Sequence, residues 1–511
     1  MWRVLAIGLA ACGAPSTPAL DIDWDTVLAP VSPRVVGHNA VWARGGLGLW
    51  DDAGRAVRAD VAALVDDLHP GVLRFPGGTR AMMYHFDETI GPVADRKPQC
   101  DTFTGMLDAT TWGMDEALGF AEAHGAEVTM VTPWHDGTPE RAAAMVAYAN
   151  ADASSAIAIG VDANGRDWGT AGTWAAQRAA NGHPAPYRVR FVEVGNEQYV
   201  TLKPGTTVCG TDRAFTQAER LENGVYIPST ARDVATQVSR TARLVKQVDP
   251  QVLVGAPALS DVLGETLDPA TAISDIDAQA GSTDAWNPTL VALAGDDFDF
   301  FVLHVYSYTS DPDRVRLADE LRHDVEQLRA IDTRHGFAVT EFGTLFDGGS
   351  QLSALDSADF VRVAVEEGAV ANLRHILIED RPSGLFATSA AILGADHALT
   401  PGYHAMRLVA GALQPVAVAW QSPDPEVVAL ATRDDASDAL GIVLIDRRLA
   451  DTELTLALPL PAGAWTGDVA TLAASSVTGT DTALTTESVT TRDRLVVTLP
   501  PNGLVVVRLA R

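Results

Sequence analysis

Two glutamates, each at the carboxyl end of a predicted buried strand, are the residues best suited to chemistry in this sequence. The first strand is predicted over 190–194 and is followed by Asn196 and Glu197. The second is predicted over 337–343 and contains Glu341. A carboxylate at the end of a parallel strand is a typical catalytic position in a barrel, although solvated carboxylates are also common at such ends. Two such strands, far apart in the sequence, favour a catalytic pair of carboxyl groups.

The elements that must position this pair alternate regularly between strand and helix. Apolar runs predict strands at 34–37, 71–75, 127–131, 190–194, 252–255, 298–306, 337–343 and 374–379. Helical spacing of apolar residues predicts helices at 59–68, 112–124, 138–150, 230–248, 313–335 and 357–370. Eight strands that alternate with helices predict the α/β class and a closed (β/α)8 TIM barrel.

The pattern changes near residue 411, where short alternating apolar runs are separated by Gly, Pro, Asp and Thr. This change predicts a C-terminal all-β sandwich domain over 412–511, after a catalytic barrel over 33–411. Within the sandwich, the Thr-rich stretch 466–491 is interpreted as a string of turns and exposed strands. Residues 12–32 are predicted to form a linker and a leading strand.

The charge balance argues against two classes of partner. The 511 residues contain 37 basic and 66 acidic side chains, and 37 − 66 gives a net charge of −29. Such a surface repels nucleic acid and anionic lipid, whereas a neutral ligand such as a sugar is indifferent to it.

The N-terminus predicts export. One cation, Arg3, precedes a short apolar run that ends in Leu9-Ala10-Ala11-Cys12, which resembles a bacterial lipobox. We therefore expect a signal peptide over 1–11, lipidation at Cys12, and either a lipid-anchored protein of the cell envelope, on the outer membrane, or a secreted protein. The alternative is an apolar N-terminus with a chance cysteine. In an oxidising compartment the remaining cysteines, Cys100 and Cys209, are candidates for a disulfide, although two free thiols are the other possibility.

Several segments, taken in order, resemble glycoside hydrolase family 51, the α-L-arabinofuranosidases of the retaining clan A. The resemblance covers roughly residues 31–408 and rests on the combination of motifs, which is more specific than any one of them. These motifs are Leu73-Arg74-Phe75-Pro76-Gly77-Gly78, Tyr84 to Pro92 with Arg96-Lys97-Pro98, Trp112 to Glu116, Tyr148-Ala149-Asn150, Asn181 to Tyr187, Val194-Gly195-Asn196-Glu197 and His304-Val305-Tyr306.

The resemblance implies a role for each residue of the site. Retaining glycosidases use a carboxylic acid and a nucleophilic carboxylate about 5 Å apart. Glu197 corresponds to the acid/base, which a neighbouring negative charge and partial burial would keep protonated, and Glu341 to the nucleophile. Asn196 corresponds to a residue that binds a sugar hydroxyl, and Tyr306 to a hydrogen-bond donor for the nucleophile.

Two further residues on the predicted barrel strands have alternative interpretations. Arg74 corresponds to the residue that keeps the nucleophile ionised, or it is a structural partner of Glu193. His304 lies on the same strand face as Tyr306 and belongs to the site, or it is an ordinary core histidine.

The sequence departs from the family at the expected substrate pocket. The family's Pro-Gly-Gly-Asn ends in Thr79, only Asn39 stands where a glutamate is usual, and the nucleophile's acidic and Trp neighbours are replaced by Thr340 and Phe342. After the third strand, Trp134 and His135 replace a polar stretch, and their rings could stack on a sugar. We therefore expect the family's chemistry to be kept and its sugar preference to be altered.

These features predict a retaining glycosidase that acts on plant-type polysaccharide or oligosaccharide through a covalent glycosyl-enzyme and needs no cofactor. The 12 histidines show no metal-ligand spacing, so no metal site is predicted. The alternatives are a clan A glycosidase of other specificity (endo-glucanase, xylosidase or glucuronidase-like) and a surface lipoprotein that only binds glycan. The sequence carries no signal for an oligomeric state.

Overall fold

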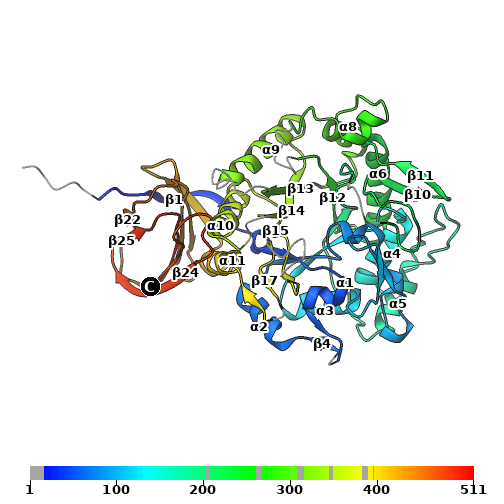
Figure 1. The fold of residues 1–511 in the computed structure, drawn as a ribbon, viewed down its shortest axis with the longest axis horizontal. Coiled ribbons are helices and arrows are strands. Elements are labelled where there is room, and N and C mark those ends of the chain that lie inside the picture. Colours follow the sequence, from blue (N-terminus) through cyan, green and yellow to red (C-terminus); the bar gives the residue numbers. More distant parts are fainter. Residues whose placement is uncertain are drawn as a thin grey trace, which may run out of the picture.

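The computed structural model describes residues 17–53, 55–201, 207–260, 268–307, 316–344, 349–381, 389–394 and 396–511. Residues 1–16, which hold the predicted signal segment and Cys12, lie outside the described residues. Figure 1 shows a larger part that contains the barrel and a smaller part that contains the C-terminal strands. Among the described residues, no helix is both long enough and apolar enough to cross a bilayer.

Eight parallel strands close into a barrel, so the predicted fold class is confirmed. Around the barrel the order is β12, β13, β14, β15, β2, β5, β8 and β9. Their bounds are Gly37–Asn39 (β2), Val72–Phe75 (β5), Glu127–Thr132 (β8), Phe191–Val194 (β9), Leu253–Pro257 (β12), Phe300–Ser307 (β13), Gly336–Thr344 (β14) and Asn372–Arg374 (β15).

Helices surround the barrel. They are α2 (Ala59–Leu68), α3 (Met114–Ala123), α4 (Pro139–Asn150), α5 (Ala171–Ala180), α6 (Ala231–Val248), α7 (Asp275–Gln279), α8 (Trp286–Ala294), α9 (Leu317–Ile331), α10 (Gln351–Glu366) and α11 (Pro401–Ala412). Helices α4, α6 and α11 each begin after a threonine whose hydroxyl accepts a hydrogen bond from a backbone N–H of the first turn. Each cap gives a hydrogen-bond partner to a backbone N–H of the first turn that has no partner within the helix.

Short elements decorate the loops. They are the 3-10 turns η1 (Pro33–Val35), η2 (Thr79–Met83), η3 (Phe86–Glu88) and η4 (Val93–Asp95), the tight turn α1 (Ala43–Gly48), and the strand pairs β3 (Trp50–Asp51) with β4 (Ala56–Val57), β6 (Gln99–Asp101) with β7 (Met106–Asp108), and β10 (Glu219–Glu222) with β11 (Val225–Pro228). Strands β16 (Ile378–Glu379), β17 (Ile392–Leu393) and β18 (Ala398–Leu399) form a separate small sheet.

Three predicted elements needed correction. The first barrel strand begins at Gly37, because Ser32 accepts a hydrogen bond from the Arg34 N–H and residues 33–35 form a 3-10 turn. The eighth strand ends at Arg374, and residues 378–379 pair in the small sheet instead. Helix α10 begins at Gln351, six residues before the predicted start, because it is buried on every side and lacks the amphipathic spacing that marks a surface helix.

The C-terminal strands form a seven-stranded sheet covered by a two-stranded one. The large sheet has the order β1, β19, β20, β21, β26, β23, β24, and β22 pairs with β25. Strand β1 is drawn in blue beside the brown and red strands in Figure 1, so the leading strand belongs to this sheet. The bounds are Asp21–Pro30 (β1), Val416–Gln421 (β19), Val427–Asp434 (β20), Ala439–Asp446 (β21), Leu454–Pro459 (β22), Trp465–Ala473 (β23), Ala483–Thr491 (β24), Arg494–Leu499 (β25) and Leu504–Ala510 (β26).

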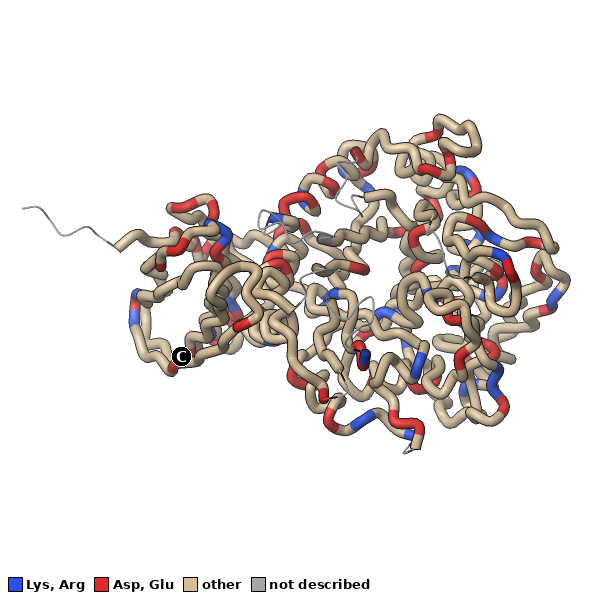
Figure 2. The backbone as a smooth tube through the Cα atoms, in the orientation of Figure 1, with Lys and Arg blue, Asp and Glu red and all other residues tan. Residues whose placement is uncertain are grey.

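The sandwich is fastened to the barrel through helix α10. The Gln351 amide donates hydrogen bonds to the carbonyls of Leu472 and Asn502, at 3.0 and 2.9 Å. Arg447 of the sandwich part contacts Asp359 of α10 at 3.1 Å. The stretch 466–491, interpreted from sequence as turns and exposed strands, contains two long paired strands, β23 and β24, of which β24 is mostly exposed. Figure 2 shows acidic and basic residues distributed over both parts.

Inside the barrel, the lumen has two layers. An apolar cluster fills the end at which the strands begin, and it includes Val72, Phe191, Phe300, Ala338 and Leu373. Because side chains alternate along a strand, residues two positions further on point into the same lumen. On three strands these are the charged or polar residues Arg74, Glu193 and Thr340. On β13 the apolar cluster continues to Val302, and His304 follows two residues later. These four polar residues form the floor of the candidate site.

Candidate active site

A tight turn directly after β9 places Glu197 at the mouth of the barrel. Gly195 has φ of +71°, and a Cβ there would lie 2.0 Å from the side-chain nitrogen of Gln198. Glu197 itself has φ of +46°, a left-handed conformation that a non-glycine residue adopts at a cost and that recurs at functional sites. Its carboxylate contacts His304 Nδ1 at 2.8 Å and accepts a hydrogen bond from Gln217 at 3.3 Å.

Glu341 lies inside β14 and is held from three sides. Arg74 on β5 and Tyr306 on β13 each donate a short hydrogen bond to its carboxylate. On the third side Gly78 leaves the space that the carboxylate occupies, because a Cβ there would lie 2.2 Å from Glu341 Oε1. The Pro-Gly-Gly turn after β5 therefore makes room for the carboxylate that Arg74 binds.

The surroundings of Glu341 keep it ionised. Burial by itself raises the pKa of this carboxyl group, but the positive charges of His304 and Arg74 and the hydrogen bond from Tyr306 outweigh it and lower the pKa to about 2. His375, whose Nε2 lies 4.0 Å from Glu341 Oε2, has a pKa lowered to about 3 by its own burial, so it is neutral at pH 7.

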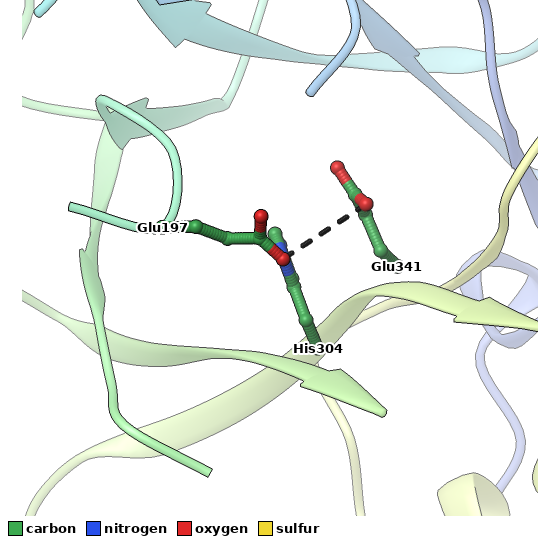
Figure 3. Close-up of side chains that lie close together, drawn as sticks. All are labelled: Glu197, His304 and Glu341. Carbon is green, nitrogen blue, oxygen red and sulfur yellow. Dashed lines mark hydrogen bonds and ion pairs between the residues drawn. The ribbon is translucent and has the colours of Figure 1, made fainter. Parts of the chain in front are cut away.

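Figure 3 shows Glu197 and Glu341 on either side of His304. Glu197 follows β9 and Glu341 lies near the carboxyl end of β14, so both are at the same end of the parallel barrel. One oxygen of each carboxylate and one His304 nitrogen all lie within 4.8 Å of one another. The sequence predicted the two glutamates as a pair and left open whether His304 belongs to the site, but it did not predict that the three side chains have the spacing of a metal site. However, the Arg74 guanidinium in contact with Glu341 would repel a divalent cation, which makes a carboxylate pair the better description.

Arg74 satisfies both interpretations that the sequence left open. Its guanidinium contacts Glu341, and its Nε also donates to Glu193 at 2.9 Å. The remaining donors bind the side-chain oxygens of Asn196 at 2.8 Å and Asn39 at 3.1 Å. Asn39 also donates to the carbonyl of Thr340 at 2.8 Å, so its amide fixes Arg74 and β14.

The two predicted stacking residues are buried. Trp134 is 4% exposed, and its indole N–H donates to Ser229 at 2.8 Å, while His135 is 1% exposed and packs against Phe215. The structure therefore gives both rings a packing role below the loop over 214–229. Thr79 is also buried, and its carbonyl accepts a hydrogen bond from Thr102 at 2.9 Å.

Sequence reasoning missed several residues of the site. Gln217 bridges Glu197 and Asn196, and its side-chain oxygen accepts from the Asn196 amide at 2.9 Å. Thr340 follows Ala338 into the lumen by alternation, and a β-bulge then shifts the pairing of β13 with β14, so that Glu341 also enters the lumen and lies opposite His304. Strict alternation would place only one of residues 340 and 341 in the lumen. No local signal marks Gln217 or the bulge.

A disulfide joins two loops beside the site. Cys100 on β6 and Cys209 form the bond, with their Cα atoms 5.7 Å apart. Cys209 lies eight residues before Gln217, so the bridge ties the segment that reaches Glu197 to the β6–β7 hairpin. Thr102 of that hairpin in turn contacts Thr79.

The fold and these side chains define a class: a (β/α)8 barrel with a carboxylate pair at the carboxyl ends of strands β9 and β14, one member held by an arginine and a tyrosine. This is the arrangement that the resemblance to clan A implies.

Within this class, comparison with known proteins finds similarity to arabinofuranosidases. A family model described as "Alpha-L-arabinofuranosidase 1 domain" matches residues 64–217. An intracellular exo-alpha-(1->5)-L-arabinofuranosidase of Halalkalibacterium halodurans is 22% identical over 276 residues, which cover 54% of this chain and 44% of that protein. The chain thus spans less than half the length of this curated relative.

Solved structures match the whole fold. The alpha-L-arabinofuranosidase of Thermotoga maritima superposes with a TM-score of 0.75 at 19% identity and covers 97% of this chain and 100% of its own. A Paenibacillus polymyxa xyloglucanase of glycoside hydrolase family 44 matches with a TM-score of 0.60 at 14% identity, over 97% and 99% of the two chains. The resemblance to family 51 indicated by the motifs is confirmed.

Proposed function

We propose that this protein is a retaining glycoside hydrolase of the α-L-arabinofuranosidase type, with Glu341 as nucleophile and Glu197 as acid/base. The observation that carries the proposal is that one oxygen of Glu197 lies within 4.8 Å of one oxygen of Glu341 at one barrel mouth. Retaining enzymes need this short separation, whereas inverting enzymes hold a water molecule between carboxyl groups that lie further apart. The family match over residues 64–217 supports the arabinofuranoside as substrate class.

The contacts of the two glutamates suit two displacement steps. In the first, ionised Glu341 attacks the anomeric carbon, the bond to the leaving oxygen breaks, and Glu197 gives that oxygen its proton. In the second, water attacks the same carbon, Glu197 takes a proton from the water, and the bond to Glu341 breaks. The net reaction adds one water and retains the configuration.

Arg74 and Tyr306 hold Glu341 in one direction through both steps, which is the positioning that covalent catalysis requires. Asn196 is held by hydrogen bonds from Arg74 and to Gln217, and it lies beside Glu197 in the chain. It is therefore placed to bind the sugar hydroxyl next to the reacting carbon. The substitutions at Thr79 and Phe342, and a neighbour that is a family 44 xyloglucanase, are the reasons to test other sugars as well.

The test is a panel of nitrophenyl glycosides that carry α-L-arabinofuranose, β-D-xylose, β-D-glucose or β-D-glucuronate. We expect turnover of the arabinofuranoside, release of the retained anomer by NMR, and a loss of kcat/KM of about 10³-fold or more in Glu341→Gln. Glu487→Gln, on the exposed strand β24, is the matched control. An inverted product would disprove the covalent route. Absence of turnover across the panel, with glycan affinity unchanged in Glu197→Gln, would identify a glycan-binding protein instead.

We also propose that the protein is exported and lipid-anchored at Cys12. The N-terminal sequence and the Cys100–Cys209 disulfide, which suits an oxidising compartment, support this location. Membrane fractionation of the full chain against Cys12→Ser tests the anchor. The curated relative is named as intracellular, and recovery of both proteins in the cytosol would overturn the proposal.

A further inference from the structure

A line of hydrogen bonds runs through the lumen from Glu197 to a second buried carboxylate. His304 Nδ1 lies 2.8 Å from Glu197, and His304 Nε2 lies 3.1 Å from the Thr340 hydroxyl. The Thr340 hydroxyl donates to Glu193 at 3.2 Å. Glu193, Thr340 and His304 are each 1% exposed, so water does not replace any of these contacts.

The direction of these hydrogen bonds follows from the donors available. Glu193 is an acceptor, because Arg74 donates to it at 2.9 Å and the Thr129 hydroxyl at 3.0 Å. The Thr340 hydroxyl has one hydrogen, and it points to Glu193. Thr340 Oγ1 must therefore accept from His304, which places a hydrogen on Nε2. The other ring nitrogen, Nδ1, is thereby left as the hydrogen-bond partner of Glu197.

We propose that Thr340, backed by Glu193, is a positioning residue that fixes the hydrogen on His304 Nε2 and so keeps Nδ1 aligned as the proton partner of Glu197. The inference rests on the proposed function, because it concerns the acid/base of that reaction. Glu197 gives a proton to the leaving oxygen in the first step and regains one from water in the second. His304 holds the Glu197 carboxyl group in place through both transfers, without a net change in its own protons.

Several charges face His304 besides Glu197. Glu341 Oε2 lies 3.9 Å from Nδ1, Arg74 and His375 act on the ring through space, and Glu193 lies behind Thr340. Burial lowers the pKa of His304, but the charge of Glu341 and the contact with Glu197 outweigh burial and raise it. A ring without the Thr340 acceptor would lose a partner for its Nε2 hydrogen, and we therefore expect it to lose a proton at lower pH.

The barrel offers a matched pair of variants. Thr340 and Thr129 are both buried, and each donates one hydroxyl hydrogen to Glu193. Only Thr340 also contacts His304. Thr340→Val and Thr129→Val therefore remove the same kind of hydrogen bond from Glu193, while one of them alone disconnects the histidine. Thr340→Ser restores the hydroxyl and serves as the rescue.

The experiment measures kcat/KM against pH for the glycoside that the wild type hydrolyses, together with the ¹⁵N NMR spectrum of the His304 ring. In Thr340→Val we expect kcat to fall about tenfold with little change in KM, and the alkaline limb to move down by about one pH unit. We also expect the His304 spectrum to lose its Nε2–H signature. Thr129→Val and Thr340→Ser should keep the wild-type profile and spectrum.

Equal pH profiles and equal ring spectra in Thr340→Val and Thr129→Val would overturn the inference. A wild type that is inactive on every glycoside would count against the proposed function alone, because the ring spectrum reports the hydrogen on Nε2 without turnover. An unchanged spectrum in Thr340→Val would overturn the inference even in an active enzyme.

Discussion

Two buried polar clusters lie on opposite sides of strand β14, and they differ in how their arginine and carboxyl groups are paired. The lumen cluster, inside the barrel, consists of Arg74, Glu193, His304, Thr340 and Glu341. The outer cluster, between the barrel wall and helix α10, consists of Thr344, Ser353, Asp356, Ser357 and Arg374. Both clusters are almost completely buried.

The difference lies in what each arginine touches. In the lumen, Arg74 binds two carboxylates directly, Glu193 and Glu341. In the outer cluster, Arg374 donates to the hydroxyls of Ser357 and Ser353, at 2.7 and 2.8 Å. Asp356 instead accepts a hydrogen bond from Thr344 at 2.8 Å.

The consequence is an opposite protonation of two buried acids on the two sides of strand β14, Glu341 on the strand itself and Asp356 on helix α10. Burial raises the pKa of both, but in Glu341 the cations lower it to about 2. In Asp356 burial, together with the charge of Asp359, raises it to about 8. Burial therefore does not decide whether a carboxyl group is ionised. The position of the cation decides it, and a nucleophile requires the lumen arrangement.

The largest effect is expected from exchanging the two arginines, one at a time, for methionine. Arg74→Met leaves Glu193 and Glu341 buried without their cation, so we expect kcat/KM to fall about 10²- to 10³-fold and the free energy of unfolding to fall by about 3–5 kcal/mol. Arg374→Met removes hydrogen bonds to two hydroxyls and a charge that lowers the pKa of Asp356, but no direct ion pair, so it should cost about 1–2 kcal/mol and change kcat/KM by less than about threefold.

Glycoside kinetics and urea unfolding measure both quantities in the two variants. If Arg374→Met lost as much activity as Arg74→Met, the two clusters would not be separate in function. If Arg74→Met kept its stability, the lumen ion pairs would contribute less than their burial indicates.

The sequence predicts the parts of this comparison that depend on local patterns. Strand–helix alternation predicts the barrel, and the motifs around Arg74, Glu197 and Glu341 place these residues at its mouth, because parallel strands present their carboxyl ends together. The disulfide between Cys100 and Cys209 was one of two possibilities, since cysteine spacing alone does not fix a pairing.

Other parts depend on tertiary contacts that leave no local signal. The bulge that brings Glu341 into the lumen next to Thr340 breaks the alternation on which strand prediction rests. Gln217 reaches Glu197 from a loop held by the disulfide. Strand β1 pairs with β19, nearly 400 residues further along the chain, and no pattern within either strand specifies the other.

The smaller effect concerns the outer cluster and appears in stability. The folded pKa of Asp356, about 8, lies above the ordinary value of 3.8, so the folded protein binds this proton more tightly than the unfolded chain. The contribution of this group to stability is therefore fully present below about pH 4 and is lost as the pH rises to about 8.

Asp356→Asn keeps the shape of the protonated acid and cannot ionise. We expect its melting temperature to exceed that of the wild type increasingly from pH 5 to pH 8, with kcat/KM nearly unchanged. Thermal unfolding of both proteins over this range is the measurement. Parallel curves would show that Asp356 is already ionised in the folded protein, and the contrast with Glu341 across β14 would then be one of contacts but not of charge.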